Sequence, residues 1–143
     1  LVFMNKLLRF GGQYRSPVLR LFDRRAGTFN ENLVHENIEL TGPTHTLHHH
    51  LLHYSYDSIE SYLTRFNAYT SAGARALHAR GRRGSVWQVV FRLPITFFSI
   101  YVLKGSALDG YPGFVWALLS AYYPVVKYIK LRELYAQHSP PKP

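Results

Sequence analysis

Histidine is the most concentrated of the residue types that could do chemistry in this chain. Eight histidines occur in 143 residues, and five of them fall within nine positions: His45, His48, His49, His50 and His53. Imidazoles bind metals, but neighbouring histidines in an extended segment point to alternate faces and cannot all reach one ion. There are no cysteines, and no histidine spacing matches a zinc pattern. The cluster therefore favours a solvated turn over a dedicated metal site.

His53 differs from the other four because it follows the apolar pair Leu51-Leu52, at the end of a predicted strand and just before a predicted helix. Enzymes built on sheets place ligands at strand ends. A solvated histidine is the default interpretation of His53, and contact with a ligand is the alternative.

Two further segments carry chemical groups. In Val34-His35-Glu36, the Glu36 carboxylate could act as general base toward an acceptor hydroxyl, and the His35 imidazole could orient it. The alternative is a surface glutamate. Arg20 lies in the apolar run Leu19–Phe22, where an unpaired guanidinium is costly and a diphosphate or carboxylate would be a fitting partner. The alternative is an edge-strand arginine whose head reaches water.

Short apolar runs broken by turn signals make up residues 1–57. Three of them read as strands: Val18–Phe22, Ile38–Leu40 and Leu51–Tyr54. Standing alone they would leave unpaired edges. We therefore predict that residues 1–57 are the edge of a larger sheet. Because the sequence begins with Leu1, without a secretory signal pattern, we also expect further chain upstream.

Residues 58–80 carry an apolar stripe at three- and four-residue spacing, which predicts an amphipathic helix. Asp57 is placed to cap it, with Glu60 three residues later, and Gly81 follows as a stop.

Residues 81–137 hold two uncharged runs, 93–103 and 110–126, of 11 and 17 residues. Each is shorter than the roughly 20 apolar residues of a spanning helix. Lys104 and Asp109 mark a turn between them. We predict a helical hairpin lying in one leaflet, with tryptophans and tyrosines at headgroup level; buried helices of a soluble core are the alternative. Residues 138–143 should be disordered.

The net charge of +9 is unevenly distributed. Residues 1–60 hold six bases and six acids, whereas residues 61–143 hold eleven bases and two acids. Excess positive charge beside apolar surface suits an anionic membrane. A basic nucleic-acid-binding module is one rival, although long uncharged runs would serve no purpose on phosphate. A non-catalytic membrane adaptor is another rival, and in such a protein Glu36 and His53 would have no function.

The ordered set of these motifs resembles bacterial family-2 glycosyltransferases of the lipopolysaccharide-core glucosyltransferase type. The resemblance covers residues 5 to 137 and rests on six pieces: Gly11-Gly12-x-Tyr14, Leu19–Phe22, Leu33–Glu36, Gly42-Pro43, Leu51–Tyr56, and Ser58 through Tyr62-Leu63 to Asn67-x-Tyr69.

This resemblance implies an α+β fold class, in which residues 1–57 are the C-terminal edge strands of a GT-A domain, followed by the amphipathic helix and the interfacial hairpin. The nucleotide-binding half of such an enzyme is expected to be missing here. The resemblance also implies that Glu36, with His35, serves as the acceptor's base. Arg20 and Tyr14 would bind substrate. His53 would reach the diphosphate or a divalent metal, Mg²⁺ or Mn²⁺, as at most one of the metal's ligands.

The expected function is transfer of a hexose from a nucleotide sugar to a lipid-linked glycan, at the cytoplasmic face of the inner membrane. The expected partners are these two substrates and an anionic membrane surface, without nucleic acid. A base for the acceptor and a metal for the leaving diphosphate are what an inverting transfer needs.

Overall fold

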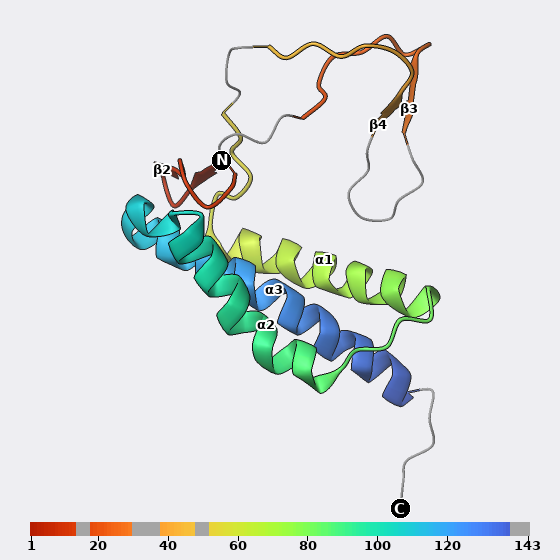
Figure 1. Cartoon of the computed structure of the whole chain (residues 1–143), viewed down its shortest axis with the longest axis vertical. Coiled ribbons are helices and arrows are strands. Elements are labelled where there is room, and N and C mark those ends of the chain that lie inside the picture. Colours follow the sequence, from red (N-terminus) through yellow and green to blue (C-terminus); the bar gives the residue numbers. More distant parts are fainter. Residues whose placement is uncertain (14–17, 30–37, 48–51, 138–143) are drawn as a thin grey trace, which may run out of the picture.

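The structure is a computed structural model that describes residues 1–13, 18–29, 38–47 and 52–137. Two small antiparallel sheets precede a helical region (Figure 1). The strands are β1 (Val2–Phe3), β2 (Lys6–Leu7), β3 (Gly27–Phe29) and β4 (Ile38–Leu40). The helices are α1 (Ile59–Ala79), α2 (Val86–Phe98), the π-helix η1 (Ser99–Leu103), the 3-10 helix η2 (Ser106–Asp109) and α3 (Gly110–Gln137).

Of the three predicted strands, one is confirmed, one is absent and one forms only a single bridge. The strand over Ile38–Leu40 is confirmed as β4, which pairs with β3 in the register Gly27↔Leu40. The prediction over Val18–Phe22 is wrong, because residues 18–23 form no strand. Residues 52–54 make a single parallel bridge, between Tyr54 and Val2. Strands form only where a neighbour takes up their hydrogen bonds, and sequence propensity does not supply that neighbour.

The amphipathic helix is present as α1, but it is capped differently from the prediction. Ser58, not Asp57, is the N-cap: its Oγ accepts a hydrogen bond from Ser61 N at 3.0 Å, and Ser61 Oγ accepts one from Ser58 N at 3.2 Å. A hydroxyl on the cap residue itself reaches the third helical amide, which a carboxylate one residue earlier does not. Gly81, with φ of +66°, follows the last turn as predicted.

Helices α1 and α2 both pack along α3 (Figure 1). Helix α2 runs antiparallel to α3, as Arg92 lies over Tyr128 and Phe97 contacts Phe114, whereas α1 runs parallel to it, as Tyr62 contacts Trp116 and His78 contacts Tyr135. Small buried side chains let α1 approach α3 closely, since Ala74, Ala117 and Ala121 are at most 1% exposed. An aromatic cluster lies at the end near β1: the Phe3 ring is 5.9 Å from that of Tyr62 and 5.5 Å from that of Trp116. Strand β1 thus contributes to the core of the helical region. Trp116, expected at the membrane interface, is a core residue instead.

A turn at residues 104–109 joins α2 and η1 to α3, as the hairpin prediction requires. One continuous helical stretch, Val86–Leu103, is long and apolar enough by length and composition to cross a membrane, with a mean hydropathy of 1.6. It includes Arg92, which is why counting uncharged residues alone gave a shorter run. The expected disordered tail, 138–143, lies outside the described residues.

Candidate functional site

The structure places two of the five predicted site residues. Tyr14, His35 and Glu36 lie outside the described residues. Arg20 is exposed and belongs to no regular element. His53 lies in the segment that leads to α1, and its carbonyl oxygen accepts a hydrogen bond from Val2 N at 2.9 Å. The predicted site is therefore not assembled within the described residues.

The His53 imidazole is exposed, with its Nε2 3.1 Å from Ser55 Oγ. An exposed ring with a hydroxyl neighbour can give one ligand to a metal ion. Among residues 1–13, 18–29, 38–47 and 52–137, however, no three His, Cys, Asp or Glu side chains lie together as a metal site requires. The described residues thus offer His53 as a single ligand.

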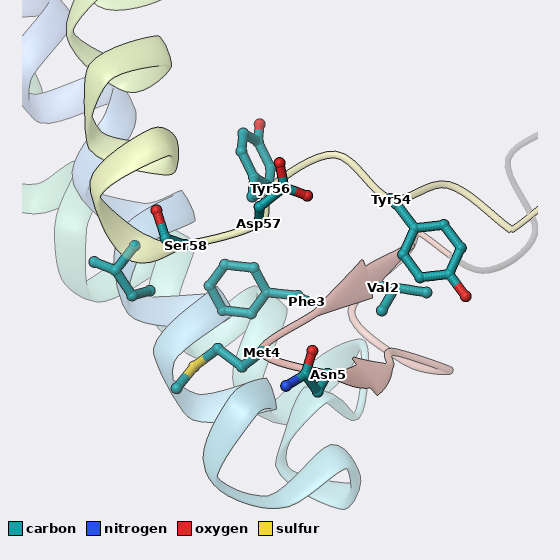
Figure 2. A pocket seen from close by; sticks show the side chains of 9 residues that line it. Val2, Phe3, Met4, Asn5, Tyr54, Tyr56, Asp57 and Ser58 are labelled. Atoms are coloured by element: carbon teal, nitrogen blue, oxygen red, sulfur yellow. The ribbon is translucent and has the colours of Figure 1, made fainter.

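An open pocket of about 290 Å³ lies where the β1–β2 hairpin meets the segment after His53. Figure 2 shows the side chains that surround it, with Tyr56 and Asp57 on one side of Phe3 and Met4 and Asn5 on the other. The lining residues are Val2, Phe3, Met4, Asn5, Tyr54, Tyr56, Asp57, Ser58 and Ile59.

The two tyrosines of the pocket differ in environment. Tyr54 is 68% exposed. Tyr56 packs edge-on against Tyr62, with ring centroids 4.7 Å apart, and the Arg65 guanidinium lies 5.7 Å from its ring centroid. Burial raises the pKa of Tyr56, helped by Tyr69 and opposed by Arg65. The Tyr56 phenol therefore stays neutral and acts as a wall of the pocket.

A strained turn closes the pocket from the β1–β2 side. The hairpin register leaves Met4 and Asn5 as a two-residue loop, with φ of 50° and 58°. Two-residue hairpins with both loop residues in the left-handed region favour Asn or Gly, so Asn5 suits its place and Met4 does not. A non-glycine residue held there costs on the order of 1–3 kcal/mol. Sequence reasoning missed this turn because two-residue strands leave no periodic signal.

The same hairpin is attached to the turn between η1 and α3. The buried Asp109 carboxylate accepts hydrogen bonds from Phe10 N at 2.9 Å and from Arg9 N at 3.1 Å. Lys6 Nζ donates to the Asp109 carbonyl at 2.7 Å, and Gly11 N donates to Lys104 O at 2.9 Å. The Asp109 carboxylate thus binds the backbone of Arg9 and Phe10, and backbone carbonyls of the same turn bind Lys6 and Gly11.

The outer face of α2 is apolar and unpartnered among the described residues. None of the side chains of Val86–Leu103 is buried. The most exposed large ones are Trp87 (69%), Ile95 (65%), Phe98 (55%) and Leu103 (71%). Soluble proteins rarely expose a continuous apolar surface of this length without a partner for it. We call these four residues the α2 face.

Basic residues near the α2 face divide into two groups. Arg80, Arg82 and Arg83 are exposed in the connection between α1 and α2. Lys130 is engaged with α1: its Nζ lies 2.7 Å from Asn67 Oδ1, 2.9 Å from Thr70 Oγ1 and 2.8 Å from Ser71 Oγ. The Lys130 ammonium is therefore engaged with acceptors of α1.

Lys127 is likewise drawn into the helical packing. Its Nζ lies 5.8 Å from the Tyr123 ring centroid and 5.6 Å from that of Tyr128. Burial lowers the pKa of Lys127, and the nearby positive charge of Arg92 lowers it further. Arg92 and Arg132 are exposed as well, so the exposed positive charge at this end is carried by arginines of the α1–α2 connection, α2 and α3.

Comparison with known proteins gives distant sequence relatives. No family model and no solved structure matches the chain. A Rickettsia felis protein named "Uncharacterized glycosyltransferase" is 26% identical over 106 residues, 74% of this chain and 38% of its own length. A protein of the same name from Rickettsia bellii is 26% identical over 113 residues, 79% of this chain and 38% of its own length. The chain therefore spans well under half the length of these curated relatives. It is a distant relative of proteins named as glycosyltransferases, and that relationship extends over about three quarters of the chain.

Proposed function

We propose that this chain works within a glycosyltransferase that moves a hexose from a nucleotide sugar to a lipid-linked glycan, such as lipopolysaccharide core, at the cytoplasmic face of the inner membrane. In this proposal residues 1–57 belong to a GT-A catalytic domain of family-2 type, and α1 to α3 hold that domain on an anionic membrane. The nucleotide-binding part of the enzyme lies outside this chain.

The observation that carries the transfer reaction is the similarity to two proteins named glycosyltransferase, which covers 74% and 79% of this chain. The aligned 106 and 113 residues exceed the 86 residues that run from position 58 to the end of the chain, so the similarity reaches into the segment before α1. This supports a link between the N-terminal segment and the catalytic part of such enzymes.

The α2 face and its arginines support the membrane part of the proposal. Apolar side chains at the surface gain free energy on entering the acyl boundary, and arginines near anionic headgroups add up to about 1 kcal/mol each. Nucleic acid, the rival partner, would use the arginines but leave Trp87, Ile95 and Phe98 in water.

The packing of the helices supports an in-plane arrangement over a crossing one. Because α1 and α2 both lie along α3, a bilayer-spanning α2 would take its neighbours with it. Helix α1 carries Glu60, Arg65 and Arg75, each costing roughly 2.5–3.5 kcal/mol at the centre of a bilayer on insertion scales. An α2 that lies in one leaflet leaves those charges in water.

Within this enzyme we keep the roles that the resemblance implies. Glu36 is the general base for the acceptor hydroxyl, with His35 beside it, and Arg20 and Tyr14 contact substrate. His53 contributes at most one ligand to a divalent metal, and the other ligands come from outside the described residues. The exposed position of His53 and its single hydroxyl neighbour are compatible with that role.

A transfer assay tests the proposal. Inverted inner-membrane vesicles that contain the polypeptide carrying this chain are given radiolabelled nucleotide hexoses and a divalent metal. Label should enter the lipid-extractable glycan fraction, and vesicles without the polypeptide should give none. Absence of incorporation from every nucleotide hexose offered would contradict the proposal.

The 143-residue chain alone should bind no nucleotide sugar in calorimetric titration, because it carries no glycine-rich phosphate loop followed by a helix. Micromolar binding by the chain alone would contradict the expectation that the donor site lies elsewhere.

A further inference from the structure

Three polar groups in the pocket beside His53 have no protein partner among the described residues. They are the side-chain amide of Asn5, the hydroxyl of Tyr54 and the carboxylate of Asp57, for which the structure gives no hydrogen bond or ion pair. They come from two segments that are about 50 residues apart in sequence and are joined by the Tyr54–Val2 bridge. Small-molecule sites typically combine apolar walls with a few such convergent polar groups.

The charge of the pocket selects the class of ligand. Its nine lining residues include one acid and no base, in a chain whose net charge is +9. The nearby Arg65 is not a lining residue: it donates to Ser55 O at 2.9 Å, and its guanidinium lies 5.7 Å from the Tyr56 ring centroid. A carboxylate without a cation repels phosphate but accepts hydrogen bonds from hydroxyl groups. The pocket therefore suits a neutral, hydroxyl-rich molecule better than a nucleotide.

The size and shape of the pocket limit that molecule further. A volume of about 290 Å³ lies at the lower end of the range of roughly 300–1,000 Å³ seen for small-molecule sites. A pocket of this volume has room for about one sugar-sized ring. Tyrosine rings offer an apolar face and a polar edge, which matches a sugar ring with its C–H face and hydroxyl rim. The left-handed Met4–Asn5 turn adds backbone strain of the kind found at ligand sites.

We propose that the pocket formed by Asn5, Tyr54 and Asp57 binds one neutral sugar ring of the glycan acceptor. The Asp57 carboxylate and the Asn5 amide hydrogen-bond its hydroxyl groups, and Tyr54 covers its apolar face. The assignment to the acceptor rests on the proposed function; the binding of a neutral sugar ring rests on the pocket alone.

Saturation-transfer NMR on the 143-residue chain tests this directly. The probes are methyl α-glucopyranoside and methyl α-mannopyranoside as neutral rings, with inorganic phosphate and uridine monophosphate as anions. A neutral glycoside should receive saturation with a millimolar dissociation constant, and the anions should not compete with it. Tyr54→Ala and Asp57→Ala should each weaken glycoside binding about tenfold, as expected for loss of a charge-assisted hydrogen bond or a stacking face.

Matched controls separate the pocket from the general surface. Tyr111 is 69% exposed, almost the same as Tyr54, and lies on α3 away from the pocket lining, so Tyr111→Ala should leave glycoside binding unchanged. Asp23→Ala removes a carboxylate from the exposed Asp23–Arg25 pair and should also be neutral. Tyr54→Phe, which removes only the hydroxyl, gives a milder variant, and circular dichroism checks that each variant keeps its helices.

Three outcomes would overturn the proposal: no saturation of either glycoside, binding as tight as wild type by the Tyr54→Ala and Asp57→Ala chains, or displacement of the glycoside by phosphate. Any of these outcomes, with label incorporation intact in the vesicle assay, would contradict sugar binding in the pocket but not the proposed transferase function. Glycoside binding that depends on Tyr54 and Asp57, without any incorporation, would instead remove the proposed function and with it the assignment to the acceptor.

Discussion

The N-terminal segment and the helical region differ in how far they bury their apolar side chains. Val18, Leu21 and Leu47 are 60%, 84% and 76% exposed, whereas Ala117 and Leu131 in α3 are fully buried. Figure 1 shows β3 and β4 lying apart from the helices, while α1 and α2 flank α3. A helix satisfies its own backbone and needs only one packed face, but a strand needs a neighbour for every hydrogen bond.

The N-terminal segment is packed only where the helical region holds it. Phe3 and Leu8 are at most 1% exposed because they enter the aromatic cluster with Tyr62 and Trp116. Asp109 fixes the backbone that follows. The helical region therefore holds the start of the N-terminal segment in place. The chemistry proposed for residues 14–57 depends on elements outside the helical region.

The largest effect we expect lies in the less packed region. In the full-length transferase, Glu36→Gln should lower turnover by about 10² to 10⁴, because an amide cannot accept the acceptor proton. The KM for the nucleotide sugar should stay nearly unchanged. Initial rates in the vesicle assay measure both quantities, and turnover close to wild type would show that the base lies elsewhere.

The α2 face should dominate membrane binding, and that is the next largest effect. Replacing Trp87, Ile95 and Phe98 together by serine should weaken partitioning of the chain into phosphatidylglycerol vesicles about 10²-fold at high salt, since partial burial of three such side chains is lost. High salt screens the arginines, so the measurement isolates the apolar term.

Serines at Leu63 and Tyr69, which are 47% and 48% exposed on α1, provide the matched control and should change partitioning little. Equal losses for the two variants would contradict a membrane surface centred on α2. Trp116→Ser is not a useful probe, because that side chain is in the core and its loss would unfold the helical region.

Topology can be read in the same vesicles by cysteine labelling. Ser106 is fully buried and donates to Gly113 O at 2.8 Å, so the exposed Ala107 is the better position in this turn. With α2 in the plane of the membrane, Ala107→Cys should react only from the cytoplasmic side. Reaction from the opposite side would show that α2 crosses.

Loss of the contact between the N-terminal segment and the helical region should have a smaller effect, and that effect should be confined to the residues near the contact. Asp109→Ala removes the acceptor for two backbone amides and should cost about 2–3 kcal/mol in urea unfolding, as for hydrogen bonds to a charged group. Helix content should be retained, while limited proteolysis near residues 6–12 accelerates. Unchanged proteolysis would show that Phe3 and Leu8 alone hold the segment.

The smallest effect concerns the packing of α1 on α3. Lys130→Met should cost about 1–2 kcal/mol, because the acceptors of Asn67, Thr70 and Ser71 lose a shared charged donor. The control on the same helix is Arg132→Met, whose single exposed contact to Gly84 O at 3.2 Å is worth less. Denaturant midpoints measure both, and an equal loss would assign the effect to general surface charge.

The sequence by itself determined the helical elements. The spacing of apolar residues predicted the helix over 58–80, and the positions of Lys104 and Asp109 predicted the turn between the two later helices, because both signals are local. It also identified β4, but it wrongly predicted a strand over Val18–Phe22, since pairing depends on a partner that local sequence does not encode. The prediction of GT-A edge strands and the roles of Tyr14, His35 and Glu36 stay predictions.

Only the tertiary structure decided which side chains are available for function. Trp116 and Trp87 look alike in sequence, yet one is in the core and the other is 69% exposed, because α1 and β1 cover one side of α3 and no described residue covers the outer side of α2. Lys130 became a structural donor because α1 presents four acceptors to it. Asn5 and Asp57 share a pocket because β1 pairs with Tyr54, a contact over some fifty residues that local sequence patterns do not reveal.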